Sequence, residues 1–416
     1  MKNRIGKALV GCVPAVILFS LGGGEAFAMK CVKPDGSGGC STTIQGAVTA
    51  AISGETIRIF PGNYAENVSI GTAGVTLLGQ GTWPGAVVVS PSSGTTVSVN
   101  APNVTLNNLT IKNGDDCVIA TAPGVKLIDT AVAVCSATGI SASAGDLLIQ
   151  NSSVRQTQGG GIVATGDGVR IVSSLIQNAG ASCIEVDGNA ARVTGNQILG
   201  CGLNGVTISG YSAVVNGNDI RGAGGHLINI EGAGARVRSN QLEGAIGAIM
   251  KIGSDSPVIT DNTGKNSASG IDVFCASCLG GQLTNNAVNN VFDCPGFKIT
   301  GETPGLVVER NSSLRNSDAG FRLSGPGMVV KYNQAHKNGA SGIELNNLGS
   351  DSGTLLLGNR ATGNAVDGIL IGSGVTGTKV RQNTARSNGH MDFYNLGTGT
   401  ILGTGFNKNF FDTVGP

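Results

Sequence analysis

The sequence predicts an all-β fold, a right-handed parallel β-helix, and two periodic patterns support this prediction. The first is a six-residue pattern of alternating apolar residues, usually ending in glycine, that recurs about every 22 residues. Alternation indicates β-strands, and so short a period leaves no room for crossover helices, so the chain must wind as a solenoid of about 15 coils. The middle position of the pattern falls at Ile119, Ser141, Val163, Glu185, Thr207, Asn229, Lys251, Asp272, Lys298, Arg322, Glu344, Leu370 and Asp392.

Asparagine recurs in a second column with nearly the same period. Amide side chains stacked at an inward-facing turn can hydrogen-bond to one another, which satisfies polar groups whose burial is otherwise costly. We therefore expect a ladder of asparagines along the inside of the solenoid. Its members are Asn196, Asn218, Asn240, Asn262, Asn286, Asn311, Asn333, Asn359, Asn383 and Asn407, preceded at the same period by Asn108, Thr130, Ser152 and Ser174.

Residues 1–28 have the features of a secretion signal. A basic start containing Lys2, Arg4 and Lys7 precedes a short apolar stretch and an Ala-x-Ala cleavage motif that ends at Ala28. We expect cleavage after Ala28 and a mature protein that is secreted or periplasmic.

Residues 29–416 are expected to form one domain. The stretch at about 43–53 is alanine-rich with apolar residues at helical spacing, which predicts a short helix that caps the open end of the solenoid. The repeats follow from about 56 to 407.

The net charge of +1, with both signs interspersed, argues against a nucleic-acid partner. No segment of the mature chain has the pattern of a membrane span.

Cysteine usage fits an oxidising compartment. Nine of the ten cysteines follow the signal segment, and two pairs with a spacing of 18 residues can meet across neighbouring coils. Cys294 is expected to pair with either member of the Cys-x-x-Cys sequence, which leaves one thiol over. The expected disulfides are Cys31–Cys40, Cys117–Cys135, Cys183–Cys201 and Cys275–Cys294, or Cys278–Cys294 in place of the last.

Two long regions resemble the pectin-lyase-like β-helix superfamily. The opening, at residues 43–48, 57–70 and 77–81, looks like the start of these proteins, including pectin methylesterases. The repeats from about 100 to 407 look like the parallel β-helix repeats of the superfamily. The resemblance covers nearly all of the mature chain. It implies the fold rather than one activity, because this scaffold hosts many activities.

Residues 113–119, followed by Cys135, resemble the Asp-Asp-Cys motif of polygalacturonases. The resemblance implies that Asp115 and Asp116 serve as acid and base in an inverting hydrolysis, where two carboxylates flank a water. The rest of the motif set departs from the family: its Gly-His-Gly corresponds to 137–139, Ala-Thr-Gly, and no Arg-Ile-Lys is present.

Because alternate strand residues point to solvent, the middle positions should form a polar stripe along one sheet. On this stripe, Asp272, Lys298 and Arg322 are candidate catalytic residues. β-Elimination of a uronate needs a base and a cation that neutralises the carboxylate. The alternative is that these charges form ion pairs between adjacent strands and only keep the sheet soluble.

Other polar stripe residues are candidates for substrate binding. Three acidic residues among them form a candidate cation site, and calcium is a candidate ion for it. The candidate cation ligands are Glu185, Asp187 and Glu231, and the remaining candidate substrate-binding residues are Asn229, Lys251 and Glu344.

Two function classes remain. In the first, the protein binds or processes a polysaccharide along the stripe, and the charged side chains and scarce aromatic residues favour an acidic glycan. In the second, it is a non-catalytic structural, surface or periplasmic protein, which the incomplete catalytic motifs favour.

Overall fold

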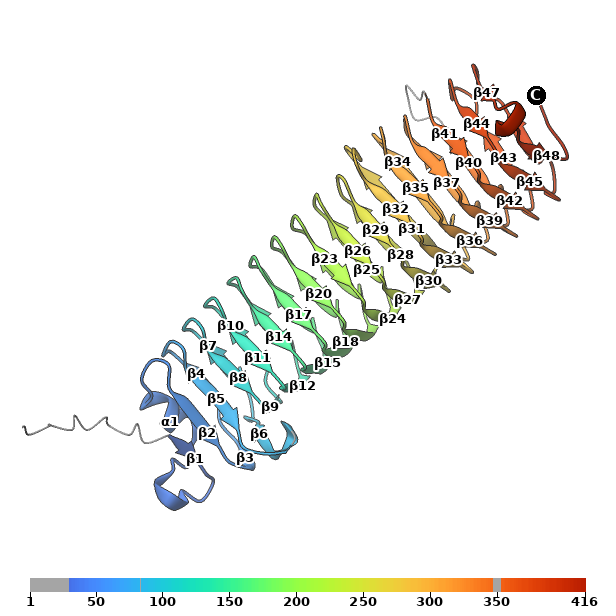
Figure 1. The fold of residues 1–416 in the computed structure, drawn as a ribbon. Helices are drawn as coiled ribbons and strands as arrows, with labels where there is room; N and C mark the ends of the chain where they lie inside the picture. The colour runs from blue at the N-terminus through green and yellow to red at the C-terminus, as the bar shows by residue number, and fades with distance from the viewer. Residues whose placement is uncertain (1–29, 83, 347–352) are drawn as a thin grey trace, which may run out of the picture.

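The chain forms a right-handed parallel β-solenoid, and the computed structural model describes residues 30–82, 84–346 and 353–416. The predicted signal segment therefore lies outside the described residues. The coils stack into a straight rod with β1 near one end and the C-terminus at the other (Figure 1). The predicted fold class is confirmed: three parallel sheets run along the rod.

The three sheets, named A, B and C here, contain 17, 16 and 15 strands in the described parts of the chain. Each coil contributes one strand to each sheet, in the order A, B, C.

Sheet A consists of β1 (Cys31–Val32), β2 (Thr56–Ile59), β5 (Thr76–Gly79), β8 (Thr105–Asn107), β11 (Lys126–Ile128), β14 (Leu148–Gln150), β17 (Arg170–Val172), β20 (Arg192–Thr194), β23 (Val214–Asn216), β26 (Arg236–Arg238), β29 (Val258–Thr260), β32 (Gln282–Thr284), β35 (Val307–Glu309), β38 (Val329–Lys331), β41 (Leu355–Leu357), β44 (Lys379–Arg381) and β47 (Ile401–Leu402).

Sheet B consists of β3 (Gly62–Tyr64), β6 (Val87–Val89), β9 (Thr110–Lys112), β12 (Ala131–Cys135), β15 (Ser153–Thr157), β18 (Leu175–Ala179), β21 (Gln197–Cys201), β24 (Asp219–Ala223), β27 (Gln241–Ala245), β30 (Thr263–Lys265), β33 (Ala287–Asn289), β36 (Ser312–Leu314), β39 (Gln334–His336), β42 (Arg360–Thr362), β45 (Thr384–Arg386) and β48 (Phe410–Phe411).

Sheet C consists of β4 (Val68–Ile70), β7 (Val97–Val99), β10 (Val118–Ala120), β13 (Ile140–Ala142), β16 (Ile162–Ala164), β19 (Ile184–Val186), β22 (Val206–Ile208), β25 (Ile228–Glu231), β28 (Ala248–Gly253), β31 (Ser269–Cys275), β34 (Phe297–Gly301), β37 (Phe321–Ser324), β40 (Ile343–Asn346), β43 (Ile369–Ile371) and β46 (Phe393–Asn395). Three short 3₁₀ turns are η1 (Ser37–Gly39), η2 (Pro84–Ala86) and η3 (Gly405–Asn407).

The core lies inside the coils and is lined by the inward residues of all three sheets. In one coil, Ile171, Ile176 and Ile184 are fully buried, and each stacks on an equivalent apolar residue of the next coil. Strands this short hold together because each pairs with parallel neighbours about 4.8 Å away on both sides. The outward residues are therefore left free to carry function.

The predicted asparagine ladder runs inside the turn between sheets A and B. Asn196 shows the pattern: its backbone N–H and its side-chain Nδ2 both donate to Oδ1 of Asn218, at 2.9 and 3.0 Å. Nδ2 also donates to the carbonyl of Ile171 on the coil before. The same bonds continue to Asn383, whose partner is Asn409 and not the expected Asn407.

A second asparagine ladder, which we did not predict, lies at the turn between sheets B and C. It links Asn316, Asn338, Asn364 and Asn388, and it ends on the buried Asp392, whose Oδ1 accepts from Asn388 Nδ2 at 2.8 Å. Asp392 therefore closes a ladder inside the solenoid and does not point outward as expected.

The N-terminal end of the rod is closed by α1 (Ile44–Thr49), which is shorter than the predicted helix. Its N–H groups at Ile44 and Gln45 donate to the carboxylate of Glu66, and Ile44 is fully buried over the first coil. Within the described residues, no helix has the length and apolar character needed to cross a membrane.

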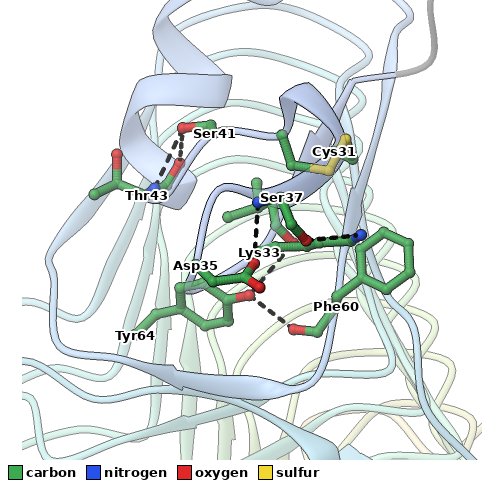
Figure 2. The surroundings of a disulfide bond; sticks show 10 residues. Cys31, Lys33, Asp35, Ser37, Ser41, Thr43, Phe60 and Tyr64 are labelled. Atoms are coloured by element: carbon green, nitrogen blue, oxygen red, sulfur yellow. Dashed lines mark hydrogen bonds between the residues drawn. A yellow bond between two sulfur atoms is a disulfide. The ribbon is translucent and has the colours of Figure 1, made fainter.

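The disulfide Cys31–Cys40 closes the loop beside α1 (Figure 2). Below it, the Tyr64 hydroxyl donates to the carbonyl of Phe60 at 2.7 Å. Burial, with the charges of Glu66 and Asp35, raises the pKa of Tyr64 to about 12, so this phenol stays protonated and keeps its bond.

The structure contains the expected pairs Cys117–Cys135 and Cys183–Cys201 as well, but the fourth disulfide differs. Cys275 pairs with Cys278, and Cys294 is free and half-buried. Cys275 is in register with Gly301, seven residues after Cys294. At about 3.3 Å per residue, Cys294 lies near the opposite end of sheet C, beyond the reach of a disulfide.

Replacement of a ladder asparagine should destabilise the rod strongly. Asn240→Ala removes the acceptor of the N–H of Asn218 and the side-chain donor to the carbonyl of Val215, and it takes one of two hydrogen bonds from Nδ2 of Asn218 and from Oδ1 of Asn262. We expect the free energy of unfolding to fall by about 3 kcal/mol, since each unpaired buried group costs about 1–3 kcal/mol. Thermal and urea unfolding followed by circular dichroism measure this loss.

Asn216→Ala is the matched control. Asn216 lies two residues before the ladder residue Asn218, but it is exposed on sheet A. Its replacement should change stability by less than about 0.5 kcal/mol. Equal losses for the two variants would contradict a special role of the ladder.

Candidate functional site

The predicted stripe exists as one continuous column on the outer face of sheet C. Each residue is in register with the next, so neighbours along the column are about 4.8 Å apart. The column ends on Tyr394, which takes the position that we assigned to Asp392. In order, the column runs Glu185, Thr207, Asn229, Lys251, Asp272, Lys298, Arg322, Glu344, Leu370 and Tyr394.

The three candidate catalytic residues of the stripe all form ion pairs. Lys298 Nζ lies 3.5 Å from Asp272 Oδ2. Arg322 donates through both terminal nitrogens to Asp318, at 2.8 Å each, and through Nε to Glu344 at 2.9 Å. Burial opposes the charge of Arg322, but the bonds to Asp318 and Glu344 raise the pKa of its guanidinium above the ordinary value. It therefore stays protonated and cannot act as a base.

The middle of the stripe carries a cation without such a partner. Lys251 is exposed, and no carboxylate of the described residues forms an ion pair with it. Beside it on the stripe, Oδ1 of Asn229 is buried and has no hydrogen-bond partner. An amide and a free ammonium group on adjacent coils can together bind a carboxylate or hydroxyl groups of a ligand.

His226 lies in the turn that leads into the stripe strand of Asn229. Its Nδ1 accepts a hydrogen bond from the backbone N–H of Ala248 at 2.9 Å, so the proton of the neutral ring lies on Nε2. Burial first, and then the charge of Lys251, lower the pKa of His226, while Asp272 opposes them. The ring is therefore a neutral hydrogen-bond donor near Lys251.

The acidic candidates do not form a cation site. Glu185 and Glu231 lie on strands two coils apart, and Asp187 lies in the turn after β19. Among the described residues, no group of three His, Cys, Asp or Glu side chains is placed to hold a metal ion. The structure thus does not assemble the expected calcium ligands.

Asp115 and Asp116 connect neighbouring coils. Asp115 Oδ1 accepts from the hydroxyl of Ser136 at 2.9 Å, and Asp116 Oδ1 accepts from the N–H of Thr138 at 2.9 Å. A later coil contains an equivalent bond, in which Oδ1 of Asn204 accepts from the N–H of His226 on the next coil. In this structure the two carboxylates therefore serve the stacking of the coils.

Several hollows that sequence reasoning missed lie on the outer face of sheet B. Residues with left-handed backbone turn the chain at both edges of this sheet, for example Asn151 and Gln156 in one coil. Three hollows of about 470, 300 and 280 Å³ follow the sheet. The last contains His336, whose Nδ1 hydrogen-bonds to the carbonyl of Thr362 at 3.0 Å.

A histidine–aspartate pair lies near the C-terminal end of the stripe. Nδ1 of the exposed His390 is 2.8 Å from Oδ1 of the buried Asp367, and the ring meets Tyr394 edge to face. Asp367 Oδ1 also accepts from the N–H of Met391 on the next coil. The sequence offered no signal for this pair, because its residues are 23 positions apart in an irregular turn.

A family model described as the right-handed beta helix region matches residues 161–304 and 289–385, which together span more than half of the chain. No curated protein sequence matches the chain significantly.

Among solved structures, the chain is similar to a PL6 alginate lyase in complex with a trisaccharide, with 13% identity and a TM-score of 0.45 over 76% of this chain and 81% of the lyase chain. It is also similar to the catalytic domain of a GH87 α-1,3-glucanase in complex with tetrasaccharides, with 11% identity and a TM-score of 0.40 over 90% of this chain and 66% of the glucanase chain. A periplasmic alginate epimerase gives 15% identity and a TM-score of 0.28 over 83% of this chain and 65% of its own. At these identities and TM-scores the likeness carries no conclusion, and the fold assignment rests on the family model and on the three parallel sheets.

The buried bond of His226 predicts a loss of stability in acid. Because the folded state lowers the pKa of His226, the unfolded chain takes up this proton more readily as the pH falls below the ordinary imidazole pKa of about 6.5. The stabilisation is thus present above that pH and lost as the pH falls through the lowered pKa.

His226→Asn should remove this acid-side loss and change little at neutral pH. Asparagine keeps an acceptor for the Ala248 N–H, as Asn204 shows one coil earlier. Thermal midpoints of the wild type and the variant between pH 4 and 8 measure the difference. Parallel pH profiles for the two proteins would contradict the assignment.

Proposed function

We propose that this chain, which belongs to the family of right-handed β-helix proteins, binds an acidic polysaccharide along the outer face of sheet C. The observation that supports this function best is the unpaired Lys251 beside Asn229, in a column whose other two cations, Lys298 and Arg322, are held by carboxylates. A carboxylated glycan laid along the column would meet a new polar side chain at each coil. The coil spacing of about 4.8 Å is close to the length of one sugar ring.

The charges favour binding over catalysis. Lys298 is held by Asp272, and Arg322 is held by two carboxylates, so neither is a free base or a free anchor for a uronate. Binding needs only a fixed cation and hydrogen-bonding groups, which the section around Lys251 and His226 supplies. The protein is then a non-catalytic glycan-binding solenoid.

The removal of Lys251 should weaken binding to acidic glycans. Exposed charge pairs contribute about 0.2–1 kcal/mol, so Lys251→Ala should raise the Kd for polygalacturonate or alginate about two- to fivefold at low salt. Isothermal titration calorimetry on defined oligosaccharides measures the change. Lys379→Ala, an exposed lysine of sheet A, is the control and should bind as the wild type does.

The same preparation tests catalysis directly. We expect neither unsaturated products by ultraviolet absorbance nor new reducing ends on polygalacturonate, pectin or alginate. Products in either assay would replace the binding proposal with an enzymatic one. Undetectable binding to every acidic glycan of the panel would contradict the proposed function.

We further propose that the protein is exported to an oxidising compartment. Three disulfides that join distant residues support this location, since such bonds rarely persist in the cytosol. In a secretion-competent bacterial host, the exported protein should begin at Met29, which N-terminal sequencing checks. Retention of the full-length chain in the cytosol would contradict this proposal.

A further inference from the structure

A basic strip follows the outer face of sheet A in the N-terminal half of the rod. Lys126, Arg170, Arg192 and Arg236 occupy the first outward position of strands β11, β17, β20 and β26, and Arg238 is the third residue of β26. All five side chains are exposed. In sheet A, β14 lies between β11 and β17, and β23 lies between β20 and β26 (Figure 1). At about 4.8 Å per coil, the strip is about 24 Å long.

The cations of this strip are uncompensated. No carboxylate of the described residues forms an ion pair with any of the five. Asp167, in the turn before β17, instead accepts the N–H of Asn189. The fold therefore leaves five positive side chains on one face without a partner.

Arg170 and Arg192 show the lack of charge compensation most clearly. They are directly opposite each other on paired strands, an arrangement in which like charges repel. Lys331, further along the same sheet, is arranged differently, because it lies opposite Glu309 with Nζ 3.0 Å from Oε2. The same sheet thus places a carboxylate opposite one cation and a second cation opposite Arg170.

We propose that the basic strip is a second binding site, which takes an anionic polysaccharide lying parallel to the axis of the rod. A linear polyanion with a charge on each sugar would meet cations at one-coil and two-coil intervals. Aliphatic side chains at Leu148 and Val214, between the cations of the same column, give the sugar rings and the arginine stems a flat apolar floor.

Several features favour a glycan over a nucleic acid. The strands from β11 to β26 carry no aromatic side chain on which unstacked bases could lie. The strip is one residue wide over most of its length, so it can follow a single polymer chain but cannot contact both strands of a duplex. The overall net charge of +1 also lacks the general basic excess of nucleic-acid-binding proteins.

Charge reversal tests the strip. The probes are polygalacturonate and a sulfated polysaccharide, titrated into the mature protein with Lys251→Ala as the background, in which binding at the sheet C site is weakened. Arg170→Glu with Arg192→Glu should raise the Kd at least tenfold and flatten its dependence on salt concentration. Lys379→Glu with Lys408→Glu makes the same change in net charge at the other end of the rod and should keep the parent affinity.

A second variant separates binding from folding. Arg170→Gln with Arg192→Gln removes the repulsion without introducing new charge, so it should weaken binding while its thermal midpoint stays equal or rises. Unchanged affinity in both strip variants would overturn the proposal. Equal loss in the Lys379/Lys408 control, or tighter binding to duplex DNA than to either glycan at physiological salt, would overturn it as well. Loss through Lys251→Ala alone tests only the sheet C function.

Discussion

The hydrogen bonding of each coil onto the next is the interaction on which the rest of the structure depends. The strands are mostly three to five residues long, too short to be stable by themselves, and each is held by parallel neighbours on both sides. Inside the turns, the bonds from Asn196 to Asn218 and onward join the side chains into a second vertical network. A coil that loses its register therefore loses backbone bonds, amide bonds and apolar contacts together.

This vertical repetition explains why the sequence predicts the fold well. A residue such as Ile184 must alternate with a polar neighbour and recur at the coil period, and both constraints are visible in one chain. Predictions that depended on exact position within a turn were less accurate. Asn409 replaces Asn407 in the ladder, and Asp392 is buried where an outward residue was expected. Consecutive ladder residues near the C-terminal end are 24 or 26 positions apart rather than 22, so a fixed period loses the register there.

The candidate site was less predictable, because its chemistry depends on contacts between side chains and not on periodicity. The column containing Asp272, Lys298 and Arg322 could be placed from the sequence, whereas the capture of Arg322 by Asp318 could not. Asp318 lies outside the strand, and only the turn geometry brings its carboxylate to the guanidinium. The same limit applies to Cys294, whose position in the turn before β34 separates it from Cys275 by the length of the strand. Spacing along the chain tells which coil a residue belongs to, but not which end of the coil it reaches.

A scaffold stabilised from within can tolerate unfavourable arrangements on its outer faces. The inward ladders and the apolar core hold the coils of Arg170 and Arg192 whatever their outward residues are, since those coils also contain Ser174 and Asn196 bonded in sequence. The repulsion between the two arginines is therefore small compared with the free energy of the cooperative stacking of the coils. The rod can carry this arginine pair without loss of the fold. The same independence explains why one architecture presents a column with paired and unpaired charges on sheet C, hollows on sheet B and an uncompensated basic strip on sheet A. Because the outward side chains of the three sheets lie on separate faces, each face can carry its own pattern of charges over the same core.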